Sequence, residues 1–162
     1  MNKKWSVIEK IIGCLITLWG MYTLYSVVSN VYGLISSGIV MTGNITYLQI
    51  VQTNHLNILL SVACIFGGMF LFYGDKAGWL LCLISCCMYA VVLFMSAASN
   101  HADIKKTSLF FYQSYSVTAI LFVIVLILLI QKPFREKYQP TVKNLRLFAL
   151  IFFALLADKI FL

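Results

Sequence analysis

The five cysteines are the first candidates for chemistry in this chain. Cys82 and Cys86 stand four residues apart, so on a helix they would share one face and could supply two metal ligands. A structural zinc site needs four ligands and a catalytic site three, and thiolates are costly to place in apolar surroundings. Cys14, Cys64 and Cys87 also fall within apolar stretches. We therefore interpret all five as small apolar packing residues, and we predict no metal and no cofactor.

The two histidines and one late acidic residue are the next candidates. His55 and His101 stand at the ends of apolar stretches, and Asp103 follows the second, so a shared metal or proton site is one alternative. Isolated histidines in polar surroundings are more typically solvated, and we favour that interpretation. Asp158 is either a functional acid within the membrane or, as we favour, an interfacial residue that reaches for water beside Lys159.

Recognisable catalytic patterns are absent from the sequence. It contains no His-Glu-x-x-His, no paired carboxylates and no Gly-x-Ser-x-Gly. Three long stretches carry no ionisable acid or base, which argues against ion-coupled transport and voltage sensing. We therefore expect a protein that is not an enzyme. An enzyme acting on a lipid or quinone remains the third alternative, and turnover that depends on His55, His101 or Asp158 would support it.

The elements that must position these residues are set by the composition. Of 162 residues, 62% are hydrophobic and 10% are charged, and the mean hydropathy is +0.94. Soluble domains carry about 25% charged residues, because their surfaces face water. The chain is therefore predicted to be an integral membrane protein. Backbone groups within lipid must bond one another, so its spans are expected to be helices.

The apolar stretches define a single all-α domain over residues 1–162. Stretches 56–73, 77–98 and 109–130 contain no Asp, Glu, Lys or Arg, and neither does 11–29. At about 1.5 Å per residue, 18 to 22 residues reach roughly the 30 Å of a hydrocarbon core. The sequence thus predicts a polytopic transmembrane helical bundle with four spans. Residues 145–162 form either a fifth span or a shorter membrane-embedded helix, after a polar linker over 132–144.

The distribution of basic residues predicts the topology. With the N-terminus in the cytosol, nine Lys and Arg residues lie inside, and Lys105 and Lys106 lie outside. Lys159 is not counted, because its side depends on whether 145–162 spans. The net charge of +7 then reflects topology and contact with anionic lipid headgroups at the cytosolic face, so we expect no nucleic-acid partner. The size and the short Lys-Lys anchor favour a bacterial inner membrane.

Small and polar residues recur at steps of three and four within the stretches, which puts each set on one helix face. Small faces let membrane helices pack closely. The predicted packing residues are Gly13, Thr17, Gly20, Gly68, Gly78, Cys82 and Ser85. A second set is either part of this packing or the lining of a polar pathway: Asn57, Ser61, Tyr112, Gln113 and Ser116.

These features favour a non-enzymatic protein that works through helix–helix association in a homo- or hetero-oligomer. In size and layout of spans the chain resembles bacterial inner-membrane immunity proteins and membrane subunits of defence or secretion systems. No diagnostic motif carries this resemblance, and we assign no family. The expected function is that of a subunit, regulator or immunity-type partner. The alternative is a homo-oligomeric channel or facilitator for a small solute, because four or five helices alone enclose little pathway.

Overall fold

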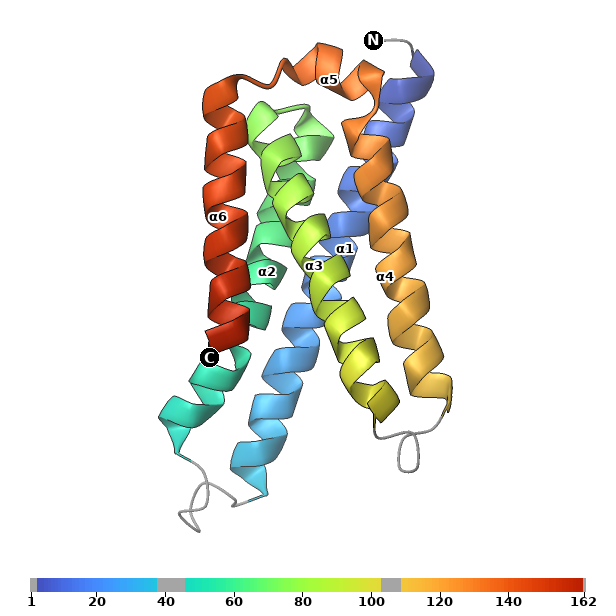
Figure 1. Cartoon of the computed structure of the whole chain (residues 1–162). Coiled ribbons are helices and arrows are strands. Elements are labelled where there is room, and N and C mark those ends of the chain that lie inside the picture. Colours follow the sequence, from blue (N-terminus) through green and yellow to red (C-terminus); the bar gives the residue numbers. More distant parts are fainter. Residues whose placement is uncertain (1–2, 38–45, 103–108, 162) are drawn as a thin grey trace.

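The chain folds into helices throughout its computed structural model, which describes residues 3–37, 46–102 and 109–161. The helices are α1 (Lys3–Ser36), α2 (Tyr47–Tyr73), α3 (Lys76–Ala102), α4 (Leu109–Ile130), α5 (Lys132–Tyr138) and α6 (Val142–Phe161). Figure 1 shows the five longer helices side by side, with α5 crossing their ends near the N-terminus. The all-α prediction is confirmed over the described residues.

Several helices are suited to a bilayer. Lys3–Ser36, Gln52–Tyr73 and Lys76–Ala98 are long and apolar enough to cross one, and a fourth candidate is Tyr115–Ile130 joined to α5 through a bend of 58°. The chain is therefore an integral membrane protein by the length and composition of its helices. The predicted fifth span, 145–162, falls in α6. That helix is apolar along its middle but carries charged residues near both ends. It is not among the helices long and apolar enough to count as candidate spans.

Consecutive helices pack against one another from α1 to α4. The turn between α2 and α3 is tight because Gly74 adopts a left-handed conformation (φ 80°) and donates its N–H to the carbonyl of Leu71 at 2.9 Å. Glycine enters that conformation without steric cost, which makes it the usual residue at this position after a helix. The core between these helices is filled by fully buried side chains, the largest of which include Leu60, Leu71, Met88 and Leu129.

Helices α1 and α2 extend beyond the rest of the structure at the end opposite the N-terminus (Figure 1). The 34 residues of α1 correspond to about 51 Å, well over the roughly 30 Å of a hydrocarbon core. The first helix therefore continues beyond the charge-free stretch 11–29, up to Ser36. Residues 38–45 lie outside the described residues. We call 30–36 of α1 with 47–53 of α2 the outer arm.

The polar linker predicted over 132–144 contains a helix that the sequence analysis missed. Pro133 stands in the first turn of α5, where its missing N–H costs nothing and its fixed φ favours a helix. Phe134 and Tyr138, one turn apart, are both buried. The helix therefore lies flat across the ends of its neighbours with its aromatic face inward, and α6 returns from it along α3 and α2.

Candidate functional site

The first group of predicted residues lies where α1 meets α2. A Cβ added to Gly13 would stand 2.8 Å from the carbonyl oxygen of Gly68, and one added to Gly20 would stand 2.7 Å from that of Ser61. A Cβ on Gly68 would overlap Thr17 and the Gly13 carbonyl. The two backbones approach so closely that no side chain fits between them. This geometry is typical of membrane helices that associate through small residues.

The second group lies on α3 and faces α2. A Cβ added to Gly78 would overlap the backbone at Phe70 and Leu71, while Cys82 and Ser85 are fully buried. All five cysteines are free: Cys64, Cys82 and Cys86 are buried, Cys87 is half-buried and Cys14 is exposed on the outside of α1. In the described part of the chain, no three His, Cys, Asp or Glu residues gather as metal ligands would.

Three hydroxyl groups connect α1, α2 and α3 within the core. Thr23 and Ser61 join through their side-chain oxygens at 2.8 Å, and the Tyr89 hydroxyl donates to Thr23 at 3.2 Å. Ser61 also donates to the carbonyl of Asn57 at 2.6 Å. Hydrogen bonds between membrane helices contribute about 0.6 kcal/mol each on average. These hydroxyls satisfy one another, so Ser61 belongs to helix packing here.

The other members of the predicted polar set lie apart from this network. The Asn57 side chain is exposed and lines a pocket at the end of the molecule far from the N-terminus. Ser116 is half-buried on α4. The side chains of Tyr112 and Gln113 lie outside the described residues, although both belong to α4. The same holds for the side chain of His101, whereas Asp103 falls in a part of the chain that the structure does not describe.

That pocket contains the one His–Asp pair among the described residues. Nε2 of His55 lies 2.7 Å from Oδ2 of Asp158, and the two side chains are 37% and 27% exposed. Nδ1 of His55 contacts the carbonyl of Gln52. Both partners are acceptors, so only the doubly protonated, positively charged imidazole would bond both at once. The pocket has a volume of about 270 Å³.

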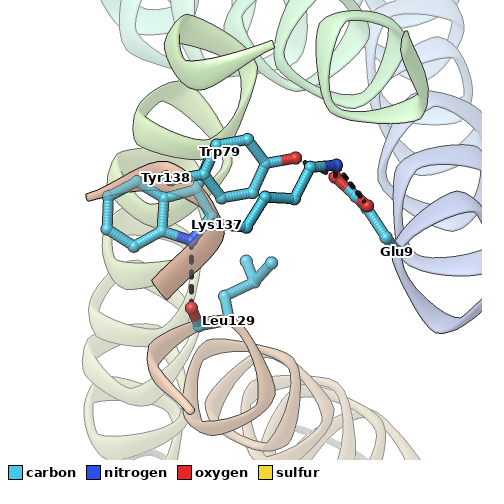
Figure 2. Close-up of polar contacts among 5 residues, drawn as sticks. All are labelled: Glu9, Trp79, Leu129, Lys137 and Tyr138. Atoms are coloured by element: carbon cyan, nitrogen blue, oxygen red, sulfur yellow. Dashed lines mark hydrogen bonds and ion pairs between the residues drawn. The ribbon is translucent and has the colours of Figure 1, made fainter. Parts of the chain in front are cut away.

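A second polar cluster lies at the opposite end, beneath α5 (Figure 2). Glu9 of α1 is 2% exposed, and both its oxygens accept from the Lys137 ammonium at 2.6 and 2.7 Å. The Tyr138 hydroxyl donates to the same carboxylate. A buried carboxylate needs such partners, because burial alone disfavours its charged form. The cluster joins the first helix of the chain to the residues that precede the last one.

Trp79 completes this end of the molecule. Its ring stacks on Tyr138 with centroids 5.6 Å apart, and its Nε1 donates to the carbonyl of Leu129 at 2.9 Å (Figure 2). Trp79 is only 3% exposed. The acceptor that it finds on α4 lets it lie inside the protein, since an indole N–H is buried readily once it has a partner.

Comparisons with protein-family models, with curated proteins and with solved structures gave no match for this chain.

Neither the His55–Asp158 pair nor the Glu9 cluster was predicted from the sequence. In the sequence Glu9 stands beside Lys10, and Asp158 was interpreted as an interfacial residue beside Lys159. A signal for the His55–Asp158 pair existed, because a fifth span would bring Asp158 to the same side of the membrane as His55. The Glu9 cluster gave no comparable signal, since its partners lie 128 and 129 residues away within a linker predicted to be irregular.

Proposed function

We propose that this chain is a non-enzymatic membrane protein that acts by binding another membrane protein, as a subunit, regulator or immunity-type partner. The observation that carries this proposal is an exposed row of side chains on α1. The row, which we call the α1 stripe, consists of Ile11, Leu15, Leu18, Tyr22, Tyr25 and Tyr32, each between 52% and 72% exposed.

The spacing of the α1 stripe is that of a helix–helix contact. Ile11, Leu18, Tyr25 and Tyr32 repeat every seven residues, with Leu15 and Tyr22 between them. This alternation of four and three residues keeps one face of a helix against a partner helix. The buried residues Glu9, Gly13, Ile16 and Gly20 have the same spacing two positions earlier, so the stripe lies on the opposite side of α1 from α2.

The tyrosines favour a protein partner over lipid alone. Tyr22 and Tyr25 lie within the charge-free stretch 11–29 and are 63% and 72% exposed. Lipid tails offer a phenolic hydroxyl no hydrogen-bond partner, whereas a neighbouring helix does. The stripe then continues past the hydrocarbon region to Tyr32 on the outer arm, where Leu48 of α2 is also 69% exposed. A partner with its own helix and an adjoining outer segment fits this continuous surface.

Site-specific photocrosslinking in native membranes tests the proposal. We expect benzoylphenylalanine in place of Tyr25 to give an adduct of one defined mass that contains a second protein. The matched control replaces Phe153 of α6, which is 64% exposed but lies off the stripe, and it should give lipid adducts only. Mass spectrometry of the adduct identifies the partner.

Two other outcomes of that crosslinking experiment argue against a heteromeric role. Adducts of equal yield and variety at both positions would mean that the stripe simply faces lipid. An adduct of two copies of this chain would favour the homo-oligomeric channel instead. In that case, solute flux into liposomes should fall when Asn57, which lines the pocket of His55 and Asp158, is replaced by Leu.

The proposal includes a topology, with the N-terminus and α5 on the cytosolic side of a bacterial inner membrane and α6 as the fifth span. The charge-free middle of α6 and the position of its last turn beside His55 support this topology.

We expect a membrane-impermeant maleimide, added outside intact cells, to label Lys159→Cys. It should label Lys143→Cys only after permeabilisation. Equal labelling of the two before permeabilisation would place both ends of α6 on one side. The native cysteines all lie within helices predicted to span, so the unmodified chain is the background control.

A further inference from the structure

An apolar hollow opens at the α5 end of the molecule, between α3, α4 and α6. Helix α6 packs on α3 and α2, and α4 packs on the other side of α3. Helices α4 and α6 therefore stand on either side of α3 (Figure 1). The hollow has a volume of about 430 Å³, within the range of about 300–1,000 Å³ typical of small-molecule sites. Its apolar lining is formed by Trp79, Leu80, Leu83, Cys87, Leu126, Ile130, Leu145 and Phe148.

The mouth of the hollow is basic. Arg135 and Pro140 line it, and the same two residues line a neighbouring hollow of about 460 Å³ together with Lys132 and Glu136. Glu136 pairs with Lys132 at 3.7 Å. Arg135 is exposed and makes no ion pair with any residue that the structure describes. A guanidinium at this position can form two parallel hydrogen bonds to a phosphate.

We propose that this hollow binds an anionic phospholipid, with an acyl chain between α4 and α6 and the phosphate on Arg135. Two features of the hollow, its apolar lining and its basic rim, favour a phospholipid as the ligand. The apolar lining excludes a free phosphate as the preferred ligand, because nothing in it could bond a second polar group. The lone guanidinium at the rim favours a lipid with an anionic headgroup over a neutral hydrocarbon. The charge lies at the level of α5, where the headgroups of that leaflet would lie.

A bound acyl chain would also fill the space between α4 and α6 at this end. The turn from α5 to α6 sets Leu145 and Phe148 over the hollow without closing it against Leu126 and Ile130. An acyl chain in this position would complete the packing of α6, which otherwise rests on few contacts with the other helices. The inference does not depend on the α1 stripe, which lies on the far side of α1 from its packing contacts.

The test uses phosphatidylglycerol with a photoreactive diazirine in one acyl chain, added to the full-length protein in mild detergent. We expect adducts to concentrate on 126–130 and 145–148, as mapped by peptide mass spectrometry. Unlabelled phosphatidylglycerol should compete, while phosphatidylcholine should compete weakly and inorganic phosphate not at all. Competition by inorganic phosphate as strong as that by the lipid would overturn the assignment of a lipid.

Two charge-matched variants locate the headgroup. Arg135→Gln should weaken phosphatidylglycerol binding roughly tenfold, the equivalent of about one charged hydrogen bond. Arg146→Gln removes the same charge from α6 at a position outside the hollow and should change binding less than twofold. Equal effects of the two variants would overturn the site, and so would adducts spread evenly over all lipid-facing helices. Both arginines are exposed, so neither variant is expected to unfold the protein.

Discussion

Gly20→Ala should destabilise the protein by about 1–3 kcal/mol, the typical cost of an added methyl group in a packed core. The new Cβ would lie 2.7 Å from the carbonyl oxygen of Ser61 and 2.9 Å from the Cβ of Cys64. One of these contacts is with backbone, so α1 must move away from α2 rather than one side chain turning aside. That movement would also stretch the hydrogen bond between Thr23 and Ser61. The midpoint of thermal unfolding in detergent, followed by size exclusion, measures the loss.

Gly33→Ala is the matched control for Gly20→Ala. Gly33 stands on the same helix, but nothing lies within 4 Å of the position that its Cβ would occupy. Alanine is favoured over glycine within a helix by about 0.5–1 kcal/mol, so this variant should be as stable as the unmodified chain or slightly more so. The two alanine substitutions thus have opposite expected signs. Equal midpoints for the two variants would refute the close approach of α1 and α2.

The helices themselves could be predicted from the sequence because their cause is local. A charge-free stretch of about 20 residues must be helical in lipid whatever surrounds it. Likewise, Gly13, Thr17 and Gly20 share a face by their spacing alone. The partner of that face does not follow from spacing, because several faces of small residues were available. The contact of Gly13 with Gly68 emerges only when both helices are placed.

The contacts at the two ends could not be predicted for a different reason. They join residues more than 100 positions apart through side chains that look ordinary in their local sequence. Glu9 next to Lys10 resembles a solvated pair, and α5 resembles a linker because it is rich in charge and lies between Pro133 and Pro140 apart from its first residues. Only the burial of Phe134 and Tyr138 turns those residues into a helix that carries Lys137 to Glu9. Tertiary packing thus determines the structure where local propensity is weak.

Lys137→Met should destabilise the protein by about 2–4 kcal/mol, because it leaves the Glu9 carboxylate buried without its counter-charge. Removing one partner of a buried ion pair typically costs about 3–5 kcal/mol. The Lys137 side chain remains 30% exposed while that of Glu9 is 3% exposed, so the expected cost lies towards the low end. Tyr138 keeps one hydrogen bond to the carboxylate in this variant, which also limits the loss. Thermal unfolding in detergent again provides the measurement.

The double variant Glu9→Gln with Lys137→Met tests whether the stability lost in Lys137→Met comes from the unpaired Glu9 charge or only from the lost contacts of Lys137. Without the carboxylate no buried charge is left uncompensated, so the double variant should recover more than half of the stability lost in Lys137→Met. Lys132→Met is the control for removing a lysine from α5. Its pair with Glu136 is exposed on both sides, at 86% and 67%, and such pairs contribute about 0–1 kcal/mol. If Lys132→Met were as damaging as Lys137→Met, or if the double variant recovered nothing, the Glu9 charge would not be what fixes α5 to α1. Recovery in the double variant would show that α1 and α5 are joined through the Glu9 carboxylate.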